Sequence, residues 1–290
     1  MKTALIDIGS NTIRLVIYEN NKEIKNTAVY AGLISDVSDG KISPEGIFKI
    51  ISALNPMKKT AAEYECCDIY AFATASLRDI SDKDGLCGCI YESTGIKIEI
   101  ISAEKEAYYD FLGLKSVLNI DSGAAFDLGG GSCQIIVFEK NLPRESASFK
   151  IGSQRLYDEF VSGVIPSEEE IGAVRRYVRR CISDMALLKG IGCEKIYAMG
   201  GAVFALCALK EKYFPSGSSC LTKNDFKNIM TLSEDKIKAV VPKRLKTVIP
   251  AAATMLEILN YTAAEQICAT GAGVRDGILA EKTDGMAKNA

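Results

Sequence analysis

The 290-residue sequence contains no histidine. Catalysis by Ser–His or Cys–His pairs and metal binding by imidazole all need this residue, so its absence excludes these mechanisms together. Any chemistry must use carboxylates, lysine, arginine, hydroxyl groups, backbone amides or a hard metal ion.

The sequence also lacks an apolar run long enough to cross a bilayer. The longest run, residues 196–209, contains two glycines and is shorter than the ~20 residues that a membrane helix needs. Residues 3–7 predict a strand, without the basic flank and small-residue cleavage site of a secretory signal. We therefore expect a cytoplasmic protein that does not span a membrane.

An excess of positive charge is missing as well. Lys and Arg number 35 against 37 Asp and Glu, which gives no general attraction to nucleic acid or to an anionic membrane. We expect no nucleic-acid partner, and any polyanion must be held locally. With 48% hydrophobic and 25% charged residues, the chain has the composition of a globular protein, and its length suits two domains.

Ten cysteines are present, but none of them form a CxxC pair. Because the chain is long enough to build a core, we predict reduced thiols rather than a disulfide framework. Cys66–Cys67 and Cys87–Gly88–Cys89 have no second pair at zinc-ligand spacing, so we assign no zinc.

A pattern of strand, polar Gly turn and strand opens the chain and returns about 120 residues later. It covers residues 4–18 and then residues 124–138. The matching pairs are Asp7 with Asp127, Gly9 with Gly129, Thr12 with Ser132, and Glu19 with Glu139. The repeat indicates two halves built on one plan.

Helices and strands alternate through the rest of the chain. A helix is predicted from Pro44 and another from Ala103, while Ser167 and Glu170 form a capping-box pattern. The mixture predicts an α/β protein without a low-complexity linker. We place one domain at residues 1–120 and a second at 121–290, each with one Gly turn.

The two turns suggest phosphate binding. Glycine lets a ligand approach the backbone closely, so N–H groups can converge on phosphate oxygens. Asp7 and Asp127 would repel phosphate unless a hard cation such as Mg²⁺ lay between them. Asp-Gly turns also commonly just end hairpins; we prefer that explanation for one turn alone and rank it second for the repeated pair.

The segment 7–16 resembles the opening motif of the exopolyphosphatase and guanosine pentaphosphate phosphatase family. Further segments match that family in the same order: residues 73–78, 100–107, 127–132 and 273–277. The resemblance implies two related actin-like (ribonuclease H-like) α/β domains with a cleft between them. It is closest to short, two-domain members without additional C-terminal helical domains, and the last helix is expected to pack back on the first domain.

The resemblance also implies roles for single residues. The family's helix-opening Glu-Glu-Ala-Arg motif here reads Lys105-Glu106-Ala107-Tyr108, which makes Glu106 the group that activates water. The alternative is a first-turn glutamate that only complements the helix dipole. The implied metal ligands are Asp7 and Asp127. The implied phosphate contacts are Gly9, Ser10, Asn11, Arg78, Gly129, Gly130, Gly131 and Ser132.

The implied function is Mg²⁺-dependent hydrolysis that releases terminal orthophosphate from inorganic polyphosphate, with short chains preferred, or from guanosine pentaphosphate. Gln134 stands where the family usually has glutamate, and Lys105 and Tyr108 also depart from its pattern. Two alternatives stay open: an ATP-binding phosphotransferase that uses Gly200–Gly201, and a non-catalytic polyphosphate or alarmone sensor. A homodimer is also left open.

Overall fold

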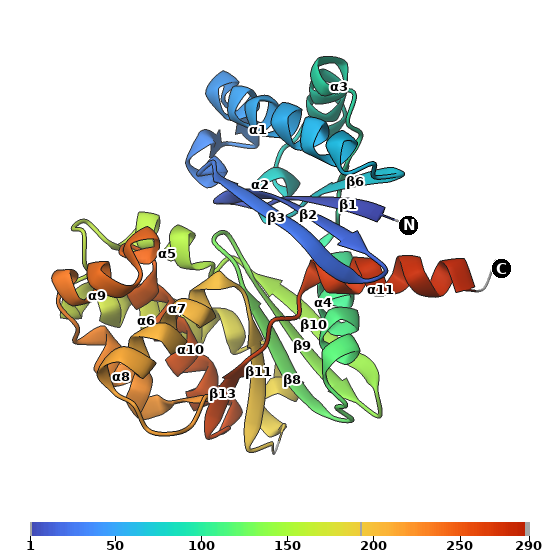
Figure 1. The fold of residues 1–290 in the computed structure, drawn as a ribbon. Coiled ribbons are helices and arrows are strands. Elements are labelled where there is room, and N and C mark those ends of the chain that lie inside the picture. The colour runs from blue at the N-terminus through green and yellow to red at the C-terminus, as the bar shows by residue number, and fades with distance from the viewer. Residues whose placement is uncertain (1, 192, 288–290) are drawn as a thin grey trace. The chain divides into compact units, whose positions relative to one another are not determined.

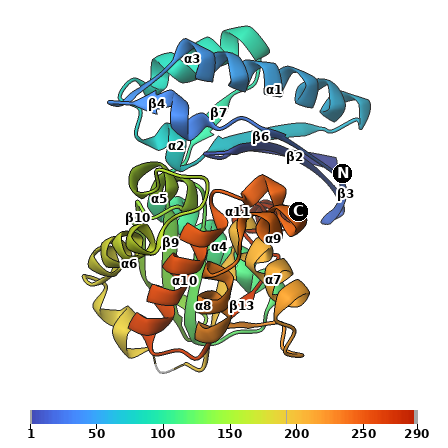
Figure 2. The ribbon, with the colours of Figure 1, turned by 90° about the vertical axis from the view of Figure 1, so that its left-hand side faces the viewer.

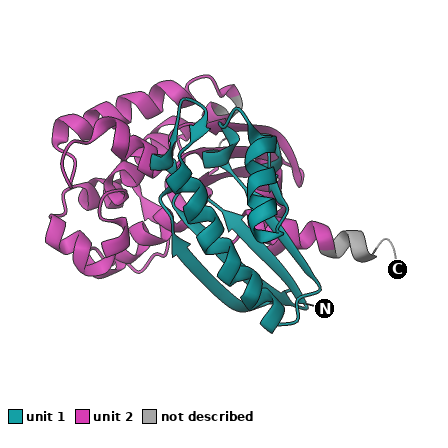
Figure 3. Ribbon diagram, turned by 90° about the horizontal axis from the view of Figure 1, so that it is seen from above, with its two compact units in different colours: residues 1–106 teal, residues 107–290 magenta. Residues whose placement is uncertain are grey.

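A computed structural model describes residues 2–191 and 193–287. The chain divides into two compact units, residues 1–106 and 107–290 (Figure 3). Each unit is a sheet with helices packed on it, which confirms the predicted α/β class. The division falls inside helix α4 (Ala103–Val117), whereas the predicted domain boundary at residue 120 follows that helix and stays a prediction.

Unit 1 is built on a five-stranded sheet with the order β3-β2-β1-β6-β7. The first three strands form antiparallel hairpins, and β1, β6 and β7 run parallel. The strands are β1 (Lys2–Ile8), β2 (Thr12–Glu19), β3 (Lys22–Tyr30), β6 (Asp68–Ala73) and β7 (Ile98–Ile100). A small hairpin, β4 (Val37–Ser38) and β5 (Lys41–Ile42), lies outside this sheet.

Helices α1 and α3 cover one face of this sheet (Figure 1). As predicted, α1 begins at Pro44, where the Ser43 hydroxyl accepts from the Gly46 amide 3.1 Å away and caps the helix. Its buried side chains, including Ile50 and Leu54, pack on the apolar sheet face. The helices of unit 1 are η1 (Leu33–Asp36), α1 (Pro44–Glu63), α2 (Ala75–Arg78) and α3 (Lys83–Thr94).

Unit 2 contains a six-stranded sheet with the order β10-β9-β8-β11-β13-β12. The strands are β8 (Gly123–Leu128), β9 (Cys133–Glu139), β10 (Leu142–Phe149), β11 (Lys195–Met199), β12 (Leu221–Thr222) and β13 (Gln266–Ala269). Its helices are α5 (Ser153–Phe160), α6 (Glu168–Ile182), η2 (Ala186–Gly190), α7 (Gly201–Tyr213), α8 (Lys223–Met230), α9 (Glu234–Val240), η3 (Pro242–Arg244), α10 (Val248–Thr262) and α11 (Val274–Ala287).

Both faces of the unit 2 sheet are covered, as Figure 2 helps to show. Side chains alternate between faces along a strand, so Phe126 joins the core under α6 and α10 while its neighbour Ala125 joins a separate cluster with Phe111 of α4. This double burial explains why β8 reads as a nearly continuous apolar run.

The predicted repeat is present residue by residue in the backbone. Asp7 pairs with Arg14 across the first hairpin, and Asp127 pairs with Gln134 across the second. Each hairpin continues through a turn of two positive-φ residues into a third strand. The pairing of the second strand with this third strand carries a register shift in both units, between β2 and β3 and between β9 and β10. The turn residues are Asn20 and Asn21 in unit 1, and Lys140 and Asn141 in unit 2.

The prediction that all thiols are reduced is wrong. Cys220 and Cys268 form a disulfide between the start of β12 and strand β13. The two strands are antiparallel neighbours, with Leu221 opposite Ile267, so the preceding and following cysteines face one another. Their separation of 48 residues in sequence hid this proximity.

Throughout residues 2–191 and 193–287, no helix combines the length and the hydropathy that crossing a bilayer requires.

Candidate active site

The parallel strands of unit 1 end at one edge of the sheet. Ile8 is opposite Ala73, and Ala73 is opposite Ile100. The amide of Thr74 donates to the Ile8 carbonyl over 3.3 Å, and the amide of Ile101 donates to the Ala73 carbonyl over 3.0 Å. The segments after β1, β6 and β7 therefore lie side by side, at the edge where open α/β sheets bind ligands.

The first predicted phosphate turn follows β1. The Gly9 amide donates to the Thr12 carbonyl over 3.1 Å, and a Cβ on Gly9 would come within 3.2 Å of that oxygen. Behind the turn, the Ser10 carbonyl accepts from the Ile34 amide at 3.0 Å. The C=O and N–H of one peptide point in opposite directions, so the Asn11 amide points away from η1.

Arg78 and Glu106, from segments that follow β6 and β7, form an ion pair through Nη2 and Oε2. Their side chains are 17% and 7% exposed. Nε of Arg78 also donates to the Ile101 carbonyl over 3.2 Å. The guanidinium thus compensates the charge of a carboxylate that is almost fully removed from water. The structure brings the two residues together, while their catalytic and binding roles stay predictions.

Two buried polar atoms lie in the segments that form the same edge. Within the described part of the chain, Asn11 Oδ1 and Ser76 Oγ are buried and meet no hydrogen-bond partner. Leaving such an atom unsatisfied costs about 1–3 kcal/mol, so each is a candidate contact for an ordered water or a ligand. Thr74 is also buried here. Sequence reasoning missed Thr74 and Ser76, although both belong to the segment 73–78 that carries the family resemblance.

The neighbours of Glu106 in the first turn of α4 differ from it. Glu104 is exposed, and its pKa is lowered by its own backbone amide and by the Ser102 hydroxyl. Lys105 pairs with Glu99 on β7, which also accepts from a tyrosine hydroxyl. Lys105 therefore binds the adjacent strand, and Glu106 is the buried acidic residue of this turn.

The second predicted turn, in unit 2, repeats the first. The Gly129 amide donates to the Ser132 carbonyl over 3.0 Å. The carbonyls of residues 129–131 accept from the Ser153 amide, the Arg155 amide and Arg155 Nε, at 3.0, 3.0 and 3.1 Å. The amides of residues 130–132 therefore point the other way, the arrangement that a phosphate-binding turn needs, while phosphate binding by this turn stays a prediction.

The α5 start lies unusually close to this turn. A Cβ on Gly152 would come within 2.4 Å of Gly130 O, Gly131 C and Ser132 N, so only glycine permits this contact. Gly152, Ser153 and Arg155 were missed by sequence reasoning because neither turn pattern includes them. They hold the loop carbonyls through the start of α5.

The predicted metal ligands are one aspartate in each unit, Asp7 beside the first turn and Asp127 beside the second. Among the described residues, no three His, Cys, Asp or Glu side chains gather as a metal site. Mg²⁺ is usually held by one or two carboxylates, water and substrate phosphate oxygens. Each aspartate supplies oxygen donors of the kind that Mg²⁺ takes, while their joint role as metal ligands stays a prediction.

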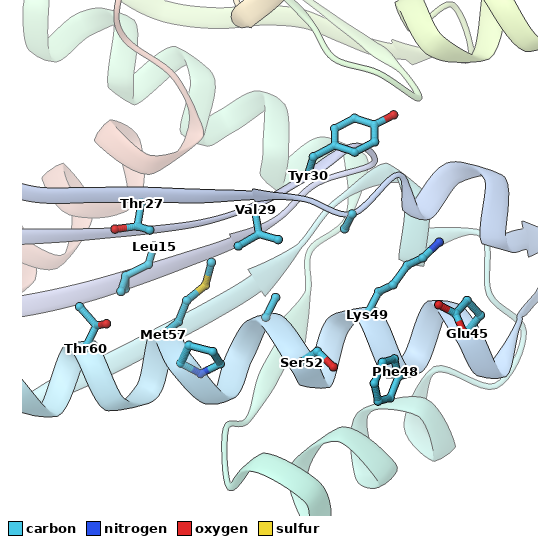
Figure 4. A pocket seen from close by; sticks show the side chains of 13 residues that line it. Leu15, Thr27, Val29, Tyr30, Glu45, Phe48, Lys49, Ser52, Met57 and Thr60 are labelled. Carbon is cyan, nitrogen blue, oxygen red and sulfur yellow. The ribbon is translucent and has the colours of Figure 1, made fainter. Parts of the chain in front are cut away.

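A cavity of about 290 Å³ lies elsewhere in unit 1, between α1 and strands β2 and β3 (Figure 4). Leu15, Val29, Phe48 and Met57 are among its lining side chains. None of the predicted site residues lines it. Its apolar character does not suit a polyanion, so it is not the predicted phosphate site.

Comparison with known sequences gives relatives of a consistent kind. A bifunctional 3-dehydroquinate synthase/phosphatase of Fusobacterium nucleatum is 28% identical over 286 residues, covering 89% of this chain and 43% of that protein. Exopolyphosphatase 1 of Mycobacterium tuberculosis is 25% identical over 186 residues, covering 61% of this chain and 54% of that protein. The chain thus spans roughly half of the length of these curated relatives.

Solved structures share the fold. The exopolyphosphatase from Cytophaga hutchinsonii matches with a TM-score of 0.85 at 22% identity, covering 98% of both chains. The Aquifex aeolicus member of the Ppx/GppA family gives 0.80 at 23% identity, covering 100% of this chain and 99% of that one. A sequence model described as the Ppx/GppA phosphatase family matches residues 21–285. With its five motifs in order and this match over most of its length, the chain belongs to the Ppx/GppA phosphatase family.

Proposed function

We propose that the protein is a Mg²⁺-dependent phosphoanhydride hydrolase that releases terminal orthophosphate from inorganic polyphosphate or guanosine pentaphosphate. The observation that carries this proposal is the ion pair between the partly buried Arg78 and the buried Glu106 at the sheet edge that also carries Asn11 and Ser76. A carboxylate can position and deprotonate the attacking water, and a guanidinium can stabilise the charge on the phosphate oxygens.

Substrate binding would change the state of the pair. A phosphate group competes with Glu106 for the Arg78 guanidinium, because bidentate arginine–phosphate bonds are strong. Once released from its partner, the Glu106 carboxylate can hold a water molecule and accept its proton. A positioned general base of this kind contributes about 10²–10⁴-fold to a rate.

The backbone turns would hold the phosphate groups. The amides of residues 130–132 would donate to the oxygens of one phosphate group. Asp7 and Asp127 would hold Mg²⁺, which neutralises phosphate charge when bound. Relatives named exopolyphosphatase support inorganic polyphosphate as the substrate class. We favour short chains because two turns alone would contact few phosphate groups.

The decisive experiment measures orthophosphate release from tripolyphosphate, long-chain polyphosphate and guanosine pentaphosphate, with Mg²⁺ and with EDTA. Glu106→Gln keeps the size of the side chain but removes the base, so release should fall at least 100-fold. EDTA should abolish release by the wild type.

Glu104→Gln is the matched control, because it removes an exposed carboxylate from the same helical turn. Its release should stay within about twofold of the wild type. Equal loss in both variants would assign the effect to charge at the helix start. Absence of release from all three substrates, with tight ATP binding, would move the assignment to a phosphotransferase.

A further inference from the structure

Gln134 occupies a buried position beside the second turn. It lies on β9, directly opposite Asp127 on one neighbouring strand and Ser148 on the other. Only 1% of the residue is exposed. Its Nε2 donates to Ser132 Oγ over 2.8 Å and to Ser148 Oγ over 3.1 Å. The Gln134 amide group therefore reaches Ser132, the last residue of the second turn.

The direction of the hydrogen bond between Gln134 and Ser132 decides whether the Ser132 hydroxyl can donate its proton to another group. An amide NH₂ group only donates, whereas a hydroxyl has one proton and two lone pairs. Because the Ser132 oxygen accepts from Gln134, its own proton is not directed at the Gln134 amide and can be donated to another group. A carboxylate in the same place would accept that proton and leave a lone pair facing the ligand.

We propose that Gln134 is a positioning residue that makes the Ser132 hydroxyl a donor to a phosphate oxygen. This inference rests on the proposed function of the second turn as a phosphate site. The hydroxyl then adds to the amides of residues 130–132, which point away from the α5 start, and gives the turn a uniform set of donors. The turn is thereby specialised for an anion, and cation binding falls to Asp127.

The test is calorimetric binding of tripolyphosphate, with and without Mg²⁺, to the full chain. Gln134→Glu reverses the polarity of the Ser132 contact, so the dissociation constant should rise about 10- to 100-fold, the effect of one hydrogen bond to a charged group. Gln134→Met introduces no buried charge and should weaken binding about 3- to 10-fold. If Gln134→Glu does not fold, the Gln134→Met variant still tests the proposal.

Two controls separate polarity from other effects. Gln266→Glu adds the same charge at the start of β13, where the glutamine side chain donates to Glu194 and none of the residues of the second turn is a partner, and should change binding less than about threefold. In a Ser132→Ala background, Gln134→Met should have little further effect, because the hydroxyl through which it acts is gone.

Three results would overturn the inference: wild-type binding in Gln134→Met, an undiminished Gln134→Met effect without the Ser132 hydroxyl, or no binding of tripolyphosphate by the wild type. The proposed hydrolase is tested separately by orthophosphate release. Binding that depends on Gln134 without release would reject the hydrolase alone, and release with unchanged binding in Gln134→Met would reject the positioning role alone.

Discussion

The guanidinium of Arg78 holds two groups at once, the buried carboxylate of Glu106 and the backbone carbonyl of Ile101. It thereby ties α2 to the start of α4 across the ends of two strands. The same contact restrains the carboxylate to which we assign the proton transfer, so the pair links stability to catalysis.

Replacing Arg78 by alanine should leave Glu106 buried without its cation. Removal of one partner from a buried ion pair costs about 3–5 kcal/mol, and the partial exposure of Arg78 places our expectation near ~3 kcal/mol. Denaturation by urea, followed by circular dichroism, measures the loss. The double variant Arg78→Ala/Glu106→Gln should recover part of this stability, because no unpaired charge remains. An equal loss in both variants would contradict this account.

Gly152→Ala should damage the second turn. The added methyl would press on three backbone atoms of the turn at 2.4 Å, and overpacking of this kind costs about 1–3 kcal/mol. Orthophosphate release should fall at least 10-fold because the amides of residues 130–132 are displaced. Gly88→Ala in α3 is the control, since its Cβ meets nothing within 4 Å. That variant should gain up to ~1 kcal/mol with unchanged release.

The Cys220–Cys268 disulfide should make stability depend on redox conditions. Its 48-residue separation corresponds to about 4 kcal/mol of loop-closure entropy in the unfolded state. Reduction by dithiothreitol should lower the melting temperature of the wild type, measured by calorimetry. The Cys220→Ser/Cys268→Ser variant should melt at the lower temperature with or without the reductant. A wild type that is indifferent to reduction would argue against a formed bridge.

Glu170 predicts a defined pH dependence. Backbone amides of Ser167 and Ser162, together with the Ser162 hydroxyl, lower its pKa from 4.5 to about 2. A carboxyl with a depressed folded pKa stabilises the fold above its unfolded pKa and loses this contribution as pH falls toward the folded value. The stability difference between wild type and Glu170→Gln should therefore be present at pH 6 and shrink between about pH 4.5 and pH 2.

Urea denaturation at several pH values measures that difference. Glu169→Gln is the control, because it removes a carboxylate from the first turn of α6 outside the capping box. Its difference from the wild type should change little over the same pH range. Parallel pH curves for Glu170→Gln and the wild type would contradict the assignment.

The sequence predicted features that depend on neighbouring residues. The two hairpins were visible because apolar strands ending in Asp-x-Gly recur, and the Ser167–Glu170 capping box was visible because both partners lie within four residues. Strand β3 was not predicted. It is an edge strand whose side chains are mostly exposed, so it lacks the alternation of a half-buried strand.

The features that sequence did not predict depend on how distant strands pair. The contact of Arg78 with Glu106 requires the parallel register of β6 and β7, and the disulfide requires β12 beside β13. The unsatisfied oxygen of Ser76 is visible only when its surroundings are built. The local sequence pattern therefore predicted the positions of both turns. The side chains that lie near each turn are set by the pairing of strands that are distant in sequence.

The hairpins β1–β2 and β8–β9 can be compared with each other residue by residue. Their backbones are equivalent, but the residue opposite the aspartate is Arg14 in one copy and Gln134 in the other. The two copies of one backbone frame therefore differ in charge, with a cationic residue paired with one aspartate and a neutral amide paired with the other. A variant in which Arg14 and Gln134 are exchanged would test whether this one pair of side chains makes the two hairpins chemically different.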